Sequence, residues 1–422
     1  MKALFSFIIL ISHCTILLGQ NELNRISIGH RSQIVSSYLG EEREFQVYLP
    51  STYCFNEIST YPVIYLLDGD YNFHYVTGLV ELASSVSGKM PECVVVGISD
   101  KGASKYKRNC TPTNLKNGTK GNAGNFMRFI SDELKPYIDS VYRTANYNVI
   151  IGHSVGGLFV TNFFLQKPDD FDAYIAIDPA LWVGEYEMAN QADSVYRTMK
   201  SISSLFYISS SNIPDMGIDK YVSVLEKYFP KNKKWKYFNL NMENHNSVGL
   251  PTIKKSFEDI FNGWSISKEQ FISFESANEV IAHYRELSDR YSVSISIHPY
   301  FLSNIIYYYT SRGREEDLLI LEEGINKYFP ASVGEFYYQL ANVHYENNSY
   351  QRAIDNYNKS IAFNSSLFYA LNGIAKVFLA QKEYEKALNN SLRSIEIAEK
   401  CNARQWMLNQ LYSTLEDIEN EM

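Results

Sequence analysis

A serine within a Gly-x-Ser-x-Gly motif is the residue whose setting most strongly indicates chemistry. The β-branched run at residues 148–151 is followed by Gly152-His153-Ser154-Val155-Gly156, and residues 158–165 have the composition of an apolar helix. A strand, a sharp turn and a helix in this order are typical of a nucleophile elbow, in which a strained turn lifts the serine hydroxyl above a sheet. Glycines suit both ends of the motif because strand and helix pass closely there. Ser154 is therefore predicted to be a nucleophile.

A serine hydroxyl needs a positioned base, and His245 is the candidate. The base of such a site is expected on a loop after the last strand, in the chain order Ser, acid, His. His245 alone among the histidines follows the last predicted strand, residues 235–240, and precedes a final helix. A lone loop histidine is usually just solvated, but the elbow requires a base at this point. His153, inside the motif, is predicted to orient the turn.

The acid that would orient His245 has three candidates. Asp215 is the first choice and Asp219 the second, because both lie in the loop after the predicted strand 205–209. Asp178, directly after the preceding strand, is the third. Each could instead be a helix cap or turn residue, the commonest role for such aspartates. A Ser–His dyad without an acid also stays open.

Two backbone N–H groups are expected to form an oxyanion hole. One is that of Val155, directly after the nucleophile. The other is expected in the loop 68–71, where Gly69 permits a turn and the amide of Asp70 is the favoured donor. No ligand cluster with metal spacing occurs in the sequence, so neither a metal nor a cofactor is expected.

The bulk composition limits the class of protein. The chain has 422 residues, enough for two or three domains, with 45% hydrophobic and 20% charged residues. A net charge of -8 argues against nucleic acid or an anionic membrane surface as a partner. The composition is that of a globular protein with a sizeable core.

The N-terminus has the pattern of a signal peptide. Lys2 precedes an apolar stretch over residues 3–18, and a cleavage after Gly19 would leave Gln20 as the new N-terminus. A lipid anchor on Cys14 is the alternative, although His13 is large for that position. No other apolar run reaches membrane-spanning length, so we expect a protein that is periplasmic or secreted and has no membrane span.

Four further cysteines remain after the signal peptide. Cys54, Cys93, Cys110 and Cys401 show no CxxC or metal spacing. We expect buried free thiols, with a single disulfide as the less favoured alternative.

Two regions of different character follow the signal peptide. Residues 24–264 alternate predicted strands with amphipathic helices, which indicates an α/β domain with a mostly parallel sheet. The strands are predicted at 43–49, 63–67, 93–98, 148–151, 174–177, 205–209 and 235–240, and the helices at 124–141, 156–166, 219–229 and 252–261.

The C-terminal region is predicted to be all-helical. Residues 265–298 form a helical connector, and residues 299–422 carry a 34-residue period in which Ala341 and Ala353 recur as Ala375 and Ala387. Small residues at this spacing are typical of tetratricopeptide repeats. Residues 304–329 indicate a degenerate earlier repeat, and residues 403–419 a capping helix.

Together these motifs resemble the esterase family of α/β-hydrolases over roughly residues 30–262. That family includes enterobactin-type siderophore esterases, S-formylglutathione hydrolases, feruloyl esterases and mycolyltransferases. The matching segments are Tyr61–Asp70, Phe129–Asp139, Arg108–Pro112 and Asp178–Trp182. The chain departs from the family in having His245-Asn246-Ser247-Val248 where His-Gly-Ser-Val is usual. The resemblance implies an α/β-hydrolase fold, and it implies that Arg108 and Trp182 reach the rim of the substrate pocket.

The leading hypothesis is an exported serine hydrolase that cleaves small-molecule carboxylic esters. Siderophore, aromatic or acyl-carbohydrate esters are the substrate classes that this hypothesis leaves open. The alternative is a catalytically degenerate hydrolase that serves as a scaffold, with a protein partner bound by the repeats. A serine peptidase is a weaker third possibility.

Overall fold

The computed structural model describes residues 27–112, 120–199, 201–230 and 234–422. The predicted signal peptide, residues 1–19 with Cys14, lies outside the described residues.

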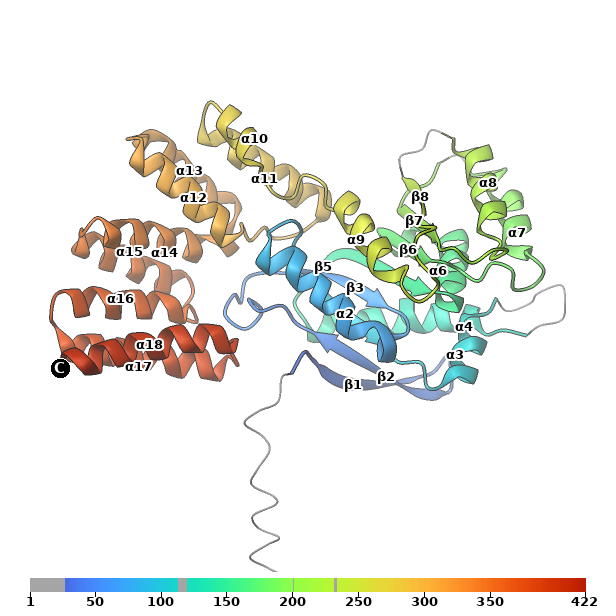
Figure 1. The fold of residues 1–422 in the computed structure, drawn as a ribbon, viewed down its shortest axis with the longest axis horizontal. Coiled ribbons are helices and arrows are strands. Elements are labelled where there is room, and N and C mark those ends of the chain that lie inside the picture. The colour runs from blue at the N-terminus through green and yellow to red at the C-terminus, as the bar shows by residue number, and fades with distance from the viewer. Residues whose placement is uncertain (1–26, 113–119, 200, 231–233) are drawn as a thin grey trace, which may run out of the picture.

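An eight-stranded sheet forms the centre of the first part of the chain (Figure 1), in the order β1-β2-β4-β3-β5-β6-β7-β8. Its strands are β1 (His30–Ser36), β2 (Glu41–Tyr48), β3 (Tyr61–Leu66), β4 (Val94–Ile98), β5 (Thr144–His153), β6 (Ala173–Ile177), β7 (Leu205–Ser210) and β8 (Trp235–Asn239). β1 pairs with β2, and β2 with β4, in antiparallel fashion, whereas all other neighbours are parallel. The predicted α/β architecture with a mostly parallel sheet is confirmed.

The edge strand β1 was not predicted from the sequence. Its residues, His-Arg-Ser-Gln-Ile-Val-Ser, lack an apolar alternation, and most of them are exposed. The strand forms because its backbone completes the ladder beside β2. A polar edge strand of this kind gives little hydrophobic signal in the sequence.

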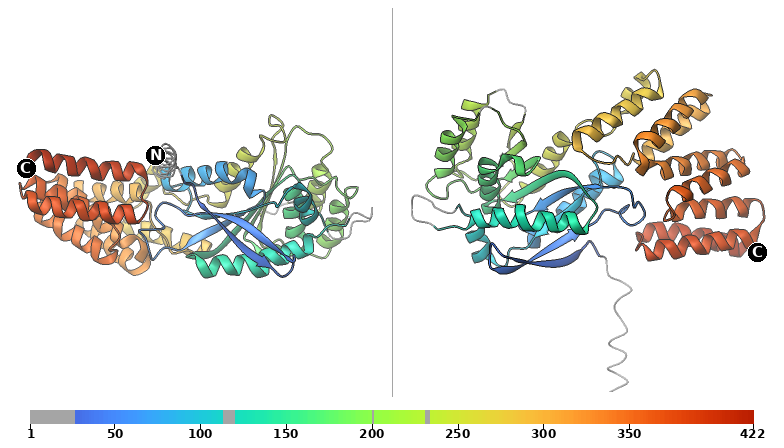
Figure 2. Two further views of the ribbon diagram at one scale, coloured as in Figure 1. Left: turned by 90° about the horizontal axis from the view of Figure 1, so that it is seen from below. Right: turned by 180° about the vertical axis from the view of Figure 1, so that it is seen from behind.

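Helices cover both faces of the sheet (Figure 2). One face packs on α2 (Gly69–Glu81), its π-helical extension η1 (Leu82–Val86), and α9 (Gly249–Ile260). The other packs on α3 (Ala103–Cys110), α4 (Ala123–Arg128), the π-helical η2 (Phe129–Leu134), α5 (Lys135–Val141), α6 (Val155–Gln166), α7 (Glu187–Tyr196) and α8 (Ile218–Tyr228), with the short 3-10 turn η3 (Pro168–Asp170) between α6 and β6. Burial on both faces accounts for the near-continuous apolar runs of the central strands.

Only helices follow the sheet domain, the name used here for residues 27–264 as described. The connector holds α10 (Lys268–Ser273) and α11 (Ala277–Tyr291). The helical array then consists of α12 (Pro299–Ser311), α13 (Glu315–Tyr328), α14 (Pro330–Glu346), α15 (Tyr350–Phe363), α16 (Phe368–Ala380), α17 (Tyr384–Lys400) and α18 (Gln405–Glu421).

A contact inside the helical array repeats after 34 residues. The hydroxyl of Ser360 on α15 donates to the carbonyl of Gly334 on α14 at 2.8 Å, and that of Ser394 on α17 donates to the carbonyl of Phe368 on α16 at 2.7 Å. The two helix pairs therefore share this contact at equivalent positions. Their assignment to the tetratricopeptide class stays a prediction.

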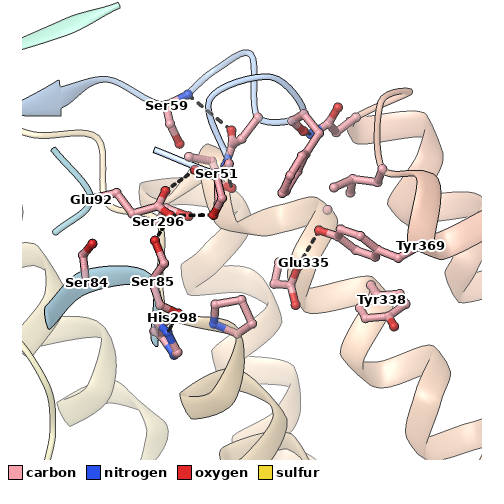
Figure 3. Close-up of a pocket in the computed structure, with 18 of the residues that line it drawn as sticks. Ser51, Ser59, Ser84, Ser85, Glu92, Ser296, His298, Glu335, Tyr338 and Tyr369 are labelled. Carbon is pink, nitrogen blue, oxygen red and sulfur yellow. Dashed lines mark hydrogen bonds between the residues drawn. The ribbon is translucent and has the colours of Figure 1, made fainter. Parts of the chain in front are cut away.

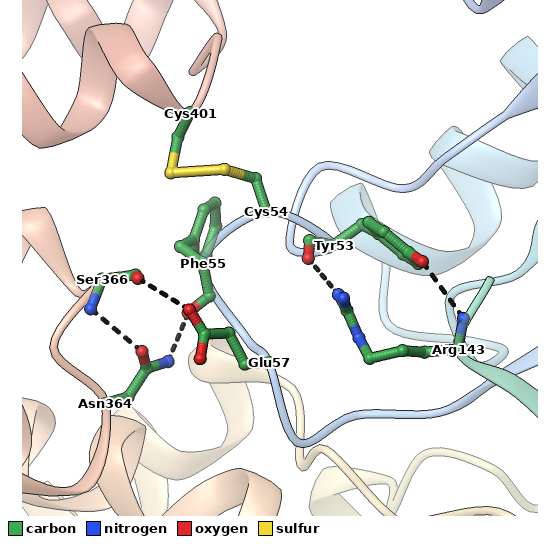
Figure 4. Close-up of a disulfide and its surroundings, with 8 residues drawn as sticks. All are labelled: Tyr53, Cys54, Phe55, Glu57, Arg143, Asn364, Ser366 and Cys401. Atoms are coloured by element: carbon green, nitrogen blue, oxygen red, sulfur yellow. Dashed lines mark hydrogen bonds between the residues drawn. A yellow bond between two sulfur atoms is a disulfide. The ribbon is translucent and has the colours of Figure 1, made fainter. Parts of the chain in front are cut away.

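A disulfide joins the sheet domain to the helical array (Figure 4). Cys54, in the loop between β2 and β3, is bonded to Cys401 at the end of α17, with the two Cα atoms 5.5 Å apart. The expectation of free thiols was wrong for this pair, because a contact across 347 residues leaves no spacing signal in the sequence. Cys93 and Cys110 are buried free thiols.

The same loop contacts the array through side chains. Phe55 packs edge-on against Phe368, with ring centroids 5.4 Å apart, and belongs to the apolar core of the array. The side-chain amide of Asn56 donates to the carbonyl of Ala331 at 3.2 Å. Outside this loop, Glu81 at the end of α2 forms an ion pair with Arg404 at 2.9 Å. These contacts and the disulfide fix the array against the sheet domain.

Among the described residues, no helix has both the length and the apolar character needed to cross a membrane.

Candidate active site

Ser154 sits in a strained turn between β5 and α6. Its backbone has φ 57° and ψ -115°, a region that side-chain-bearing residues rarely occupy. A Cβ atom on Gly152 would lie 2.4 Å from the carbonyl oxygen of Gly156, so the first turn of α6 crosses the end of β5 without room for a side chain. The hydroxyl of Ser154 forms no capping bond to α6, so the residue does not serve as an ordinary helix cap.

Hydrogen bonds to the next strand hold this turn in place. The amide of Ser154 donates to the carbonyl of Ile177 at 2.9 Å, and the amide of Ala180 donates to the carbonyl of Ser154 at 2.9 Å. Ile177 is the last residue of β6. The elbow is thus anchored to the segment that carries Asp178.

His245 is paired with Asp178. Nδ1 of His245 lies 2.6 Å from Oδ2 of Asp178, whose side chain is fully buried. Asp178 also accepts hydrogen bonds from the amide of Ser211 at 2.9 Å and from its hydroxyl at 2.6 Å. Burial opposes ionisation, but the bonds from His245 and Ser211 outweigh it and lower the pKa of Asp178. The site therefore holds a carboxylate aimed at one imidazole nitrogen.

The first choice for the acid, Asp215, does not occupy this position. Asp215 is exposed in the loop after β7, with φ 61°, and Asp219 is exposed in the first turn of α8. The loop after β7 contributes Ser211 instead, which binds the acid supplied by β6. The carboxyl ends of adjacent parallel strands lie side by side, so a loop one strand away reaches the same histidine.

The turn that carries His245 is fixed by its own side chains. Oδ1 of Asn244 accepts hydrogen bonds from the amides of Asn246 at 2.9 Å and Ser247 at 3.1 Å. The hydroxyl of Ser247 accepts from the amide of Asn244 at 3.0 Å. Such Asx turns stabilise a defined loop conformation. The Asn-His-Asn-Ser run thus has a structural reason that the sequence signal did not reveal.

His153 packs against His245 from inside the elbow. The two ring centroids are 4.5 Å apart. Burial, reinforced by the neighbouring His245, lowers the pKa of His153 to about 4. At neutral pH His153 is therefore an uncharged ring that positions its neighbour without repelling a protonated His245. The predicted role of His153, to orient the turn, stays a prediction.

Both predicted oxyanion donors lie at helix N-termini. Val155 is the first residue of α6, and Asp70 is the second residue of α2, which begins at Gly69 where a loop was expected. The first amides of a helix lack intrahelical partners. The carboxylate of Asp70 accepts from Gln46 at 3.1 Å, from Ser99 at 3.2 Å and from the amide of Asp100 at 3.1 Å, which holds its backbone in place.

The two helix starts lie next to one another. A Cβ atom on Gly156 would be 3.2 Å from Oδ2 of Asp68 and 2.4 Å from the hydroxyl of Tyr106. Tyr106, on α3, donates to Oδ2 of Asp68 at 2.5 Å. Burial raises the pKa of Asp68 to about 7, with the Tyr106 bond opposing the shift and Asp100 adding to it. This protonatable pair went unnoticed in the sequence.

Both predicted substrate residues are partly exposed, but the guanidinium of Arg108 is held by neighbouring groups. Trp182 is half exposed and lies two residues after Ala180, which is bonded to the elbow. The guanidinium of Arg108 donates two hydrogen bonds to Oδ1 of Asn109, at 3.0 and 3.1 Å, and lies 3.6 Å from Oε1 of Glu41. Within the described ranges, no three His, Cys, Asp or Glu side chains are grouped as a metal site would require.

Comparisons with known proteins point to esterases. Residues 36–205 match the family model Esterase, described as "Putative esterase". The chain is 32% identical over 163 residues to the ferri-bacillibactin esterase BesA of Bacillus subtilis, and 27% identical over 148 residues to the siderophore triacetylfusarinine C esterase of Aspergillus fumigatus. Each alignment covers 33% of this chain, and they cover 55% and 51% of those proteins. The chain therefore spans about half the length of these relatives.

Two solved structures resemble the fold. An IroE-like serine hydrolase from Shewanella oneidensis superposes with a TM-score of 0.59 and 26% identity, covering 71% of this chain and 99% of that one. An uncharacterised protein from Capnocytophaga ochracea superposes with a TM-score of 0.54 and 14% identity over 91% of this chain and 99% of its own. The second likeness concerns the fold alone and extends over most of the chain.

The Asp68–Tyr106 pair predicts a pH-dependent stability that Asp68→Asn removes. As pH rises from about 4 to about 7, unfolded Asp68 loses its proton while folded Asp68 keeps it, so ionisation increasingly favours unfolding. The wild type should lose stability relative to Asp68→Asn by no more than roughly 4 kcal/mol between pH 4 and pH 8. Urea unfolding of both proteins across this range measures the difference. Asp215→Asn, at an exposed position, should follow the wild type; parallel curves for wild type and Asp68→Asn would contradict the assignment.

Proposed function

We propose that this protein is an exported serine hydrolase that cleaves carboxylic esters through an acyl-enzyme. The observation that carries the proposal is the strained turn of Ser154 anchored to the strand end whose Asp178 binds His245 at 2.6 Å. The resemblance to siderophore esterases supports an ester as the substrate. A degenerate scaffold would have no need of a buried carboxylate paired with a histidine beside a strained serine.

In the proposed first step, Oγ of Ser154 attacks the ester carbonyl carbon. Nε2 of His245 takes the hydroxyl proton, and Asp178 stabilises the resulting imidazolium through Nδ1–H. The mechanism also requires that Oγ of Ser154 approach Nε2 of His245. Catalytic contacts of this kind often tighten only when substrate is bound. The amides of Val155 and Asp70 would hold the tetrahedral oxyanion, supported by the positive ends of α6 and α2.

Collapse of the tetrahedral intermediate then releases the alcohol. His245 donates its proton to the leaving oxygen, so the alcohol departs neutral and the acyl group stays on Ser154. Water, deprotonated by His245, attacks the acyl-enzyme at the same carbon. The carboxylic acid leaves, and Ser154 regains its proton. His153, uncharged near neutrality, lets His245 gain and lose its proton without a second charge beside it.

We further propose an aromatic or otherwise apolar ester as the substrate, of the kind found in siderophores. Four large apolar side chains, each between 43% and 92% exposed, lie in segments that follow the carboxyl ends of four parallel strands. This apolar rim consists of Tyr71, Trp182, Ile213 and Met242. Exposed apolar residues gathered around a polar site are typical of ligand contact. The relatives act on siderophores by their names, which agrees with this chemistry.

Export to an oxidising compartment is the proposed location. The N-terminal pattern of residues 1–19 supports it, and so does the Cys54–Cys401 bond, because structural disulfides persist mainly outside the reducing cytosol. The periplasm and the extracellular medium both satisfy this condition.

The triad assignment predicts distinct effects for two aspartates in the same region. Ser154→Ala and His245→Ala should abolish hydrolysis of p-nitrophenyl acetate and labelling by a fluorophosphonate. Asp178→Asn should lower kcat by about 10⁴-fold, because His245 loses its orienting carboxylate. Asp215→Asn, the matched control, should stay within about twofold of the wild type, as surface substitutions usually do. Full activity in Ser154→Ala, or equal effects of the two aspartate variants, would contradict the mechanism.

The apolar rim predicts that Trp182→Ala discriminates between large and small esters. For a catecholate siderophore ester, kcat/KM should fall about tenfold, because one aromatic contact is lost. Hydrolysis of p-nitrophenyl acetate, which is too small to span the rim, should be nearly unchanged. Trp406→Ala, an exposed tryptophan of the helical array, is the control. A uniform loss on both esters would place Trp182 in the fold and not in substrate contact.

The proposed location predicts that the signal peptide is removed and that two of the four remaining cysteines are oxidised. N-terminal sequencing of the exported chain should begin at Gln20. Under denaturing conditions without reductant, thiol titration should detect the two free thiols of Cys93 and Cys110, and reduction should add those of Cys54 and Cys401. Retention of an intact N-terminus inside the cell, or four free thiols before reduction, would argue against export.

A further inference from the structure

A large cavity lies between the sheet domain and the helical array, away from the candidate active site. Its volume is about 510 Å³, within the range of small-molecule sites. Its lining includes Tyr61 and Glu92, which stand at or just before the amino ends of β3 and β4. Ser154, Asp178 and His245 stand at or beyond the carboxyl ends of their strands and do not line it. The cavity is therefore separate from the proposed chemistry.

The cavity has a carboxylate on each of its two walls (Figure 3). Glu92, from the sheet domain, accepts a hydrogen bond from Ser85 at 2.6 Å and another from Thr52. Glu335, from α14, accepts from Gln339 at 2.7 Å and from Tyr369 at 2.7 Å. Burial raises the pKa of both, and among the described residues neither forms an ion pair with lysine or arginine. Both walls thus present carboxyl groups that pair with no lysine or arginine, and His298 opposes the rise in the pKa of Glu335 only in part.

Two further polar atoms in the lining lack partners. The amide oxygen of Asn372 and the hydroxyl of Ser59 are buried and form no hydrogen bond among the described residues. Asn372 is 6% exposed and Ser59 is 2% exposed. Buried polar atoms without partners are costly, so such atoms mark places where a ligand or water completes the bonding. Asn372 lies one turn after Tyr369 on α16, near the bond to Glu335.

The lining also includes two cationic side chains, Arg404 and Lys376, and the imidazole of His298. Arg404 is paired with Glu81 at 2.9 Å, and Lys376 is exposed on α16. His298 is held by its own contacts, with Nε2 at 3.1 Å from the carbonyl of Ser85 and Nδ1 accepting from the amide of Tyr300 at 3.3 Å. None of these three side chains is hydrogen-bonded to Glu335 among the described residues, so its carboxyl group is left for a ligand that brings donors.

Aromatic rings surround Glu335. Tyr338 and Tyr369 meet edge to face with centroids 4.5 Å apart, and Phe55 lies 6.0 Å from Tyr369. Aromatic faces attract organic cations, and an ammonium group carries three donors and no acceptor. The walls are already fixed by the Cys54–Cys401 bond and by the Arg404–Glu81 pair, so little ordering is needed on binding.

We propose that this cavity is a second binding site, for a small organic ammonium compound whose amine is held by Glu335 among Tyr338, Tyr369 and Asn372. The apolar body of the ligand lies against Phe55 and the neighbouring side chains of α16. Glu92, on the opposite wall, adds negative potential. The site requires no part of the proposed ester hydrolysis.

Calorimetric titration with phenethylamine tests the proposal on the full mature chain. Phenethylamine should bind saturably, whereas the isosteric neutral 2-phenylethanol should bind about tenfold more weakly, because it lacks the charge-assisted hydrogen bond. Glu335→Gln should weaken phenethylamine binding by about tenfold as well. Glu346→Gln, an exposed position on the same helix, should bind like the wild type. Ser154→Ala should also bind normally.

Several outcomes would overturn the proposal. They are the absence of binding to a folded wild type, equal binding of amine and alcohol, and unchanged binding in Glu335→Gln. Asn372→Ala removes the unpartnered amide oxygen and provides a second variant should Glu335→Gln fail to fold. It should weaken amine binding, and unchanged binding in this variant would contradict the proposed site.

Discussion

The close crossing of β5 and α6 is the constraint on which the rest of the site depends. Gly152 and Gly156 leave no space for side chains at this crossing, and Ser154 between them is forced to a positive φ. The strain is balanced by the hydrogen bond from the amide of Ser154 to the carbonyl of Ile177 and by the first turn of α6. Because the turn is bonded to the end of β6, the position of Ser154 also sets where Asp178, and through it His245, must lie. The turn at Ser154 thus positions three residues that come from three different loops.

The ionisable groups of the site differ in the direction in which their surroundings shift the pKa. Asp178 has its pKa lowered by donors from two neighbouring loops and is an anion. His153, buried beside His245, has its pKa lowered to about 4 and is neutral. Asp68, behind Gly156, has its pKa raised to about 7 by burial. Burial alone would favour the neutral form of all three; hydrogen-bond donors to the carboxylate make the difference at Asp178. The charge is thereby concentrated on the one carboxylate that faces His245.

The helical array is fixed at the end of the sheet domain opposite the site. The apolar core on one face of the sheet continues into α11–α14. Phe55 from the sheet domain packs into the apolar core of the helical array, beside Phe368 of α16. The disulfide closes a loop of 347 residues, for which chain entropy gives a stabilisation of several kcal/mol in the unfolded-state account. Two helix pairs alone would form a short array, and these contacts explain how it is stabilised without further repeats. The interface also encloses the cavity that neither part would form by itself.

The sequence by itself determined the features that depend on local order along the chain. The elbow at Ser154, the buried strands, the loop position of His245 and the 34-residue period were all readable, because each is written in neighbouring residues or in a fixed spacing. Tertiary structure decided the rest. Asp178, and not Asp215, is the aspartate that contacts His245, because strand ends from separate parts of the chain meet at one edge of the sheet. The polar strand β1 forms only beside β2, and Cys54 meets Cys401 only after the array has docked. Pairing between residues far apart in the chain leaves no local pattern, so only the folded chain reveals it.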